Sequence, residues 1–102
     1  MASYREDITT PIKLKLIGYI RDMVVQKGWT QTEAAKNLDI SRSRFCRIMG
    51  GQTKDISEWR LMQCLAMLGS DVKIFIVPTQ CSQGKIEIVD ISAPPKQEQN
   101  LV

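Results

Sequence analysis

The sequence has no histidine and only three cysteines among its 102 residues. Histidine is the commonest general base and the commonest metal ligand in proteins, so its absence argues against most enzymatic and metal-dependent functions. The cysteines Cys46, Cys64 and Cys81 form no CxxC pair, which argues against a structural zinc site. We expect three unpaired thiols, buried or half-buried, in a protein of a reducing compartment, with no cofactor and no metal.

The sequence also lacks a long apolar run and a visible secretory signal. A membrane-spanning helix needs roughly 18 consecutive apolar residues, so we expect a cytoplasmic protein that does not enter a membrane. It has neither a glycine-rich phosphate-binding loop nor a paired nucleophile and base, so we do not expect the protein to be an enzyme. What it does have is 43% hydrophobic residues, enough for the modest core of one domain.

The first predicted helix follows a loose N-terminal arm, residues 1–10. Thr10 and Pro11 are typical of a helix start, with an N-cap followed by proline in the first turn. Apolar residues then recur every three or four positions, at Ile12, Leu16, Ile17, Ile20, Met23 and Val24. This spacing predicts one buried helical face, and Gly28 is expected to end the helix.

Two short helices are predicted next, joined by about three residues. Thr30 and Glu33 form a capping box at the start of the first, and Ala34–Ala35 are small enough for a second helix to cross closely. Ser41 is expected to cap the second, from Arg42 to about Met49, before a glycine pair. This pattern predicts a helix-turn-helix, in which the second helix enters the major groove of DNA.

Positive charge is concentrated on that second short helix and the loop after it. Residues 41–54 carry four positive charges and no negative one, although the whole chain has a net charge of only +3. An arginine can donate two hydrogen bonds to guanine, worth roughly 1–3 kcal/mol of discrimination. The alternative is that three arginines on a short helix form only a solvent-exposed face. Here they coincide with the helix caps and the short turn of a helix-turn-helix, which favours DNA binding. We expect DNA contacts from Gln31, Ser41, Arg42, Ser43, Arg44, Arg47, Gln52, Thr53 and Lys54.

A fourth helix, from Glu58 to Leu68 with Ser57 as its cap, is predicted to be apolar on two faces. A chain of this length has little to cover the second face, which is formed by Trp59, Met62 and Ala66. We therefore expect a second subunit there. The alternative is that the C-terminal segment folds over this face.

Two strand patterns follow the helices. Residues 72–77 are rich in β-branched side chains, and residues 85–91 alternate between apolar and charged ones. Two strands alone are marginal in water, and pairing across a two-fold axis would solve this, although the sequence leaves open whether the strands pair within or between subunits. We expect Val72, Ile74 and Ile76 in the dimer interface. The predicted organisation is an arm (1–10), a helix-turn-helix domain (11–70), a dimerising strand or hairpin (71–91) and a disordered tail (92–102).

The segment from Thr30 to Gly50 resembles the xenobiotic-response-element (XRE) helix-turn-helix family of phage repressors. The resemblance is carried by Thr30-Gln31, Ala34-Ala35, Leu38-Asp39-Ile40-Ser41, Arg44-Phe45 and Gly50. Asp39 stands where members of the family commonly have glycine. The longer run, through Leu68-Gly69 to Pro78, is similar to the HigA-like antitoxin branch of that family.

The resemblance implies a mainly α fold: a lambda-repressor-like helix-turn-helix bundle of four to five helices with a short C-terminal β-strand or hairpin. It implies a homodimeric repressor on a palindromic operator, with operator contacts at Gln31, Arg42, Ser43 and Arg47 and with Arg44 on phosphate. A HigA-like antitoxin would also bind a RelE-like ribonuclease toxin. The alternatives are a stand-alone prophage or host regulator, and a protein-interaction module that has lost DNA binding.

Overall fold

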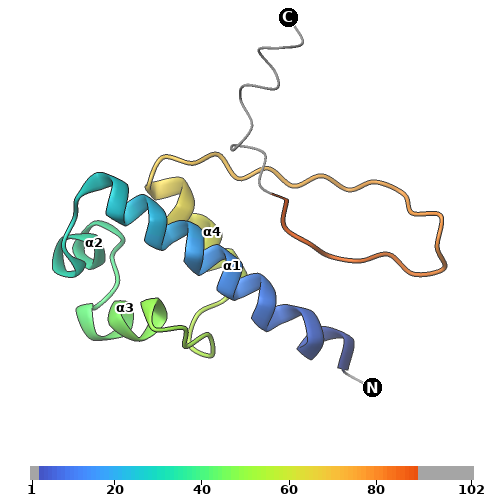
Figure 1. Ribbon diagram of the computed structural model, residues 1–102, viewed down its shortest axis with the longest axis horizontal. Coiled ribbons are helices and arrows are strands. Elements are labelled where there is room, and N and C mark those ends of the chain that lie inside the picture. The colour runs from blue at the N-terminus through green and yellow to red at the C-terminus, as the bar shows by residue number, and fades with distance from the viewer. Residues whose placement is uncertain (1–2, 90–102) are drawn as a thin grey trace, which may run out of the picture.

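A computed structural model describes residues 3–89, and the side chains from Thr10 onward. That part of the chain contains four helices and no strand (Figure 1). The helices are α1 (Ser3–Lys27), α2 (Gln31–Asn37), α3 (Arg42–Met49) and α4 (Glu58–Met67). The mainly α prediction is confirmed, whereas the expected tail, residues 92–102, lies outside the described residues.

Helix α1 begins at Ser3, which corrects the prediction of a loose arm up to residue 10. Pro11 lies inside the helix instead of opening it. An interior proline removes one hydrogen bond and presses on the carbonyl four residues earlier, at a cost of roughly 3 kcal/mol. This cost weakens a helix without having to end it. Further along, α1 buries Leu16, Ile17 and Ile20 in the core, and this packing outweighs local preference.

Hydrogen bonds at the helix starts confirm the predicted caps. Thr30 Oγ1 accepts from the Glu33 backbone N–H at 3.1 Å, and Glu33 Oε1 accepts from the Thr30 N–H at 2.8 Å. The hydroxyls of Ser41 and Ser57 accept from the N–H three residues later in the same way. Each cap satisfies a backbone donor that the helix itself cannot, so α2, α3 and α4 begin where the sequence predicted.

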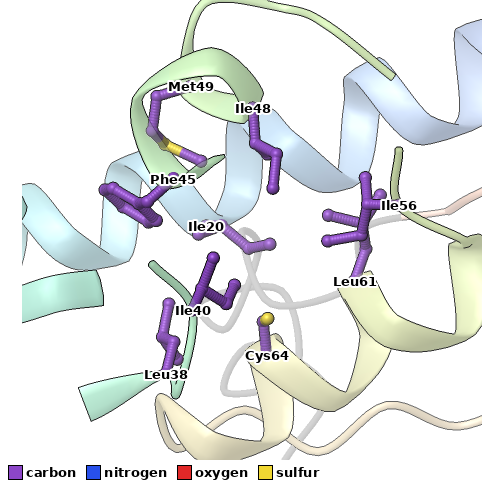
Figure 2. Close-up of a pocket in the computed structure, with 9 residues that line it drawn as sticks. All are labelled: Ile20, Leu38, Ile40, Phe45, Ile48, Met49, Ile56, Leu61 and Cys64. Atoms are coloured by element: carbon purple, nitrogen blue, oxygen red, sulfur yellow. The ribbon is translucent and has the colours of Figure 1, made fainter. Parts of the chain in front are cut away.

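The helices pack as two pairs, α1 with α4 and α2 with α3, and α1 also contacts α3. Figure 2 shows where the pairs meet: Ile20 from α1, Phe45 and Ile48 from α3 and Cys64 from α4 point into one space. This junction leaves no room for a water molecule, and its residues are Ile20, Leu38, Ile40, Phe45, Ile48, Met49, Ile56, Leu61 and Cys64. A tightly filled junction fixes the distance between α3 and the rest of the bundle.

The chain after α4 forms no strand as far as residue 89, so the predicted strands at 72–77 and 85–91 are wrong there, and residues 90–91 lie outside the described part. It runs away from α4 and turns back toward α1 (Figure 1). Lys15 Nζ donates to the Ile88 carbonyl at 3.3 Å where it returns. β-Branched residues favour an extended backbone, but a strand also needs a hydrogen-bonded neighbour, and none pairs with residues 71–89 here.

The three thiols are free, and they differ in exposure. Cys64 is buried and Cys46 is half-buried, as expected, but Cys81 is exposed because the C-terminal segment that carries it is uncovered. Within residues 3–89, no group of histidine, cysteine or acidic side chains is placed to hold a metal. None of the helices described there combines the length and apolar character that a membrane crossing requires.

Candidate nucleic-acid interface

Helix α3 lies at the edge of the bundle (Figure 1). It has one apolar and one polar face. Phe45 and Ile48 are almost completely buried. Arg42, Ser43 and Arg47 are exposed on the other side. The orientation predicted from the helical period is therefore correct, and the exposed face offers two guanidinium groups and a hydroxyl to a partner.

Arg44 is held within the protein. Its side chain is half-buried, and its Nη2 donates to the backbone carbonyl of Asp55 in the loop between α3 and α4. The same arginine supplies the backbone N–H that the Ser41 hydroxyl accepts. Ser41 thus caps the start of α3, and Arg44 joins its first turn to the loop that follows the helix. The predicted phosphate contact of Arg44 stays a prediction.

Asp55 places one negative charge beside the exposed face. Its Oδ2 lies 3.8 Å from Arg47 Nη2, and both side chains are about half exposed or more. An exposed ion pair of this kind is worth roughly 0–1 kcal/mol, so a phosphate can displace it. Asp55 directly follows the basic stretch of residues 41–54, and local spacing does not indicate that its carboxylate lies beside Arg47.

Gln31 is positioned by a thiol from α3. Cys46 Sγ donates to Gln31 Oε1 at 2.8 Å, which joins the start of α2 to the middle of α3. The amide oxygen is thereby used, so the NH2 end of Gln31 is the donor available to a phosphate. Beside this pair is a depression of about 370 Å³, lined by Arg21, Val24, Val25, Trp29, Gln31, Phe45, Cys46, Met49 and Gly50. Sequence spacing alone gave no signal for the Cys46 contact.

The loop after α3 is fastened to α1. Lys13 Nζ donates to the Thr53 carbonyl at 2.9 Å. Thr53 is half-buried, while Gln52 and Lys54 are exposed. Gly51 has a φ of 98°, a conformation that L side chains rarely adopt, and this allows the chain to turn directly after the helix. The loop therefore holds Gln52 and Lys54 beside the end of α3.

Two further arginines, which the sequence analysis did not single out, bind the backbone around α3. Arg60 in α4 donates to the carbonyls of Leu38 and Asp39 in the turn before α3, at 3.1 Å each. Arg21 in α1 donates to the Met49 carbonyl at the end of α3, at 2.5 Å. A guanidinium that donates to backbone carbonyls in this way fixes main chain, and these contacts join segments far apart in sequence.

The residues expected in a dimer interface have unequal exposure. Trp59 is 64% exposed and Ala66 is exposed, whereas Met62 is half-buried against the core. As far as residue 89, the C-terminal segment does not cover Trp59. Val72, Ile74 and Ile76 are exposed too, up to 91% for Ile76. The described chain therefore leaves both predicted interface regions uncovered.

Comparisons with known proteins agree with this geometry. Residues 2–77 match the helix-turn-helix domain family. Among curated proteins, none matches the sequence. A solved structure named as an XRE-family transcriptional regulator superimposes with a TM-score of 0.72 and 25% sequence identity, over 83% of this chain and 96% of that one. Because the family match spans most of the sequence and the fold agrees, the chain belongs to the helix-turn-helix domain family.

Proposed function

We propose that this protein is a DNA-binding transcriptional regulator that places α3 in the major groove of its operator. The observation that carries the proposal is the exposed face of α3, where Arg42, Ser43 and Arg47 stand opposite the buried Phe45 and Ile48. Guanidinium and hydroxyl groups on a rigid helix match the acceptors and donors of base edges. The family match and the XRE-named structure support the same function.

Residues around α3 would hold the DNA backbone in this arrangement. Gln31 at the start of α2 would donate to a phosphate on one side, and Gln52, Thr53 and Lys54 would do so on the other. Ser41 and Arg44 border this surface, but their side chains already bind the protein backbone. We therefore assign these two residues to holding the interface in shape.

Selection from random duplexes tests DNA binding directly. The purified protein should enrich a common sequence, and its affinity should fall steeply between 50 and 200 mM salt, because phosphate contacts release counterions. Arg47→Ala should lose roughly 1–3 kcal/mol of binding free energy at particular base pairs of the operator, whereas Lys54→Ala should weaken binding to all sequences alike. Binding that ignores salt would favour the alternative, an interaction module that has lost DNA binding.

We further propose that the protein binds a palindromic operator as a homodimer. Two copies of α3 would then lie about one helical turn apart, roughly 34 Å, in successive major grooves. The interface would combine Trp59, Met62 and Ala66 of α4 with Val72, Ile74 and Ile76 of the C-terminal segment. What supports this is that the described chain leaves large apolar side chains in both regions exposed.

The narrower role that we propose is that of an antitoxin that represses its own operon and binds a RelE-like toxin. It is supported by the similarity of the chain, up to Pro78, to the HigA-like branch. A reading frame of toxin size beside the gene, with a product that co-elutes with this protein, is the expected result. If the neighbouring gene encodes nothing that binds, the protein acts as a stand-alone regulator.

A further inference from the structure

Arg60 connects α4 to the turn that precedes α3. One nitrogen of its guanidinium, Nη2, donates to the carbonyls of both Leu38 and Asp39 at 3.1 Å, and the first of these bonds is partly buried. Asp39 has a φ of 60°, the left-handed conformation that costs a residue with a side chain more than it costs glycine. A single side chain therefore holds two consecutive carbonyls of a strained turn.

The position of that turn decides where α3 begins. The helices pack as the pairs α1–α4 and α2–α3, so the turn belongs to one pair and Arg60 to the other. The main chain of Arg60 is fixed, because its backbone N–H donates to the Ser57 hydroxyl at 3.1 Å. Arg60 therefore provides a direct hydrogen-bonded link from a rigid helix start to the backbone just before α3.

The opposite end of α3 is held independently. Arg21 of α1 binds the carbonyl of Met49, the last residue of α3, and Phe45 and Ile48 fill the core beneath it. The first turn of α3 is joined to the loop after the helix by Arg44 and to the turn before it by Arg60, which binds the Leu38 and Asp39 carbonyls. That first turn carries Arg42 and Ser43, and Arg60 acts on the backbone directly before it.

We propose that Arg60 is a positioning residue for base recognition, which holds the turn at Leu38 and Asp39 so that Arg42 and Ser43 meet their base edges. The inference rests on the proposed DNA-binding function. Hydrogen bonds to bases tolerate a displacement of only about 0.5 Å, whereas a long flexible lysine such as Lys54 still reaches a phosphate. Loss of Arg60 should therefore reduce specific binding more than non-specific binding.

The test compares Arg60→Met, which keeps the apolar stem, with Arg60→Lys, which keeps the charge. Fluorescence anisotropy gives the Kd for the best duplex selected by the wild type and for a scrambled duplex at one salt concentration. We expect the affinity of Arg60→Met to fall at least tenfold for the selected duplex and less than threefold for the scrambled one. Lysine has a shorter side chain with a single donor nitrogen. The ratio of the affinities for the selected and the scrambled duplex should therefore fall at least threefold in Arg60→Lys. Lys36→Met, an exposed residue of α2, is the matched charge control and should leave the ratio unchanged.

Thermal unfolding of each variant separates positioning from folding. Equal losses on the two duplexes with Arg60→Met would overturn the proposal, because they would mean that only charge or fold stability had changed. If Arg60→Met does not fold, an unchanged ratio with Arg60→Lys overturns it. A wild type without any sequence preference would instead refute the proposed function. The hydrogen bonds of Arg60 to the Leu38 and Asp39 carbonyls would then be tested by NMR. The amide chemical shifts of residues 39–41 should change in Arg60→Lys, and unchanged shifts would show that these bonds do not hold the turn.

Discussion

At the scale of single residues, Asp55 opposes the charge that α3 presents. It lies 3.8 Å from Arg47, and its removal would free that arginine and delete one repulsion toward phosphates. The bond from Arg44 uses the backbone carbonyl of Asp55, so Asp55→Asn leaves it intact. We expect Asp55→Asn to bind duplex DNA about two- to fivefold more tightly at low salt, which is the range of an exposed ion pair.

Anisotropy titrations at 50 and 200 mM salt measure this change, which should shrink at the higher salt because exposed charges are then screened. Asp71→Asn removes the same charge from the exposed segment after α4 and serves as the control. An affinity for Asp55→Asn that is equal to or below that of the wild type would show that Asp55 does not compete with DNA.

Cys64 is a buried residue whose ionisation affects the stability of the fold. Burial raises the pKa of its thiol above the ordinary value, and the nearby charges of Arg60 and Arg44 act in the opposite direction. The folded chain thus holds this proton more tightly than the unfolded chain does. The contribution of Cys64 to stability is therefore complete below about pH 8.5, the ordinary thiol pKa, and is lost as the pH rises beyond it.

Urea unfolding at pH 7, 8.5 and 9.5 tests this sign. The free energy of unfolding of the wild type, relative to that of Cys64→Val, should decrease over the two higher pH values. Cys81→Ser, which changes an exposed thiol, should follow the wild type throughout. If the wild type and Cys64→Val change in parallel with pH, the Cys64 thiol does not titrate differently on unfolding.

At the scale of the elements, local chemistry was sufficient for α2, α3 and α4. Their starts depend on a hydroxyl and a backbone N–H three residues apart, which a sequence displays directly. The start of α1 was not predictable in this way, since packing far from Pro11 decides whether the helix survives it. The strand pattern at 72–77 reflects β-branched side chains, but a local pattern cannot supply a neighbouring strand, and none forms as far as residue 89.

The same distinction applies to the candidate site. The helical period gave the exposed face of α3, because Arg42, Ser43 and Arg47 are related by local geometry. The contacts of Arg60 and Arg21 join residues 21 or more positions apart, and no local spacing indicates them. Contacts of this kind require the tertiary fold, which is why the sequence predicted the exposed face of α3 but not the residues that hold this helix in place.

Two serines of the α3 region, Ser41 and Ser43, allow the effect of a substitution on stability to be separated from its effect on DNA recognition. The Ser41 hydroxyl caps the helix, whereas Ser43 is exposed on its outer face. We expect Ser41→Ala to lower the free energy of unfolding by about 1 kcal/mol, and Ser43→Ala to leave it within roughly 0.5 kcal/mol. Ser43→Ala should instead weaken binding to the selected duplex. Urea unfolding and anisotropy on both variants measure this, and a Ser43→Ala protein with unchanged sequence preference would remove Ser43 from the reading surface.

At the scale of the whole molecule, the exposed apolar surface requires an explanation. The buried core residues lie between Leu16 and Leu68, yet Ile74, Phe75, Ile76 and Val77 in the segment after α4 are each more than two-thirds exposed. Exposed apolar patches of this kind mark interaction sites. An extended segment without a neighbouring strand can gain one from an identical segment across a two-fold axis, which would also cover its unpaired backbone groups.

A dimer of this kind should dissociate when a charge is placed in its interface. Ile76→Asp and Trp59→Asp would each bury a carboxylate against apolar side chains, so we expect both to sediment as monomers at concentrations where the wild type is a dimer. Neither residue belongs to the buried core, so thermal unfolding of the monomers should stay cooperative. Gln80→Asp, beyond Pro78, is the control and should remain dimeric. A dimeric Ile76→Asp would exclude the C-terminal segment from the interface, and a dimeric Trp59→Asp would exclude that face of α4.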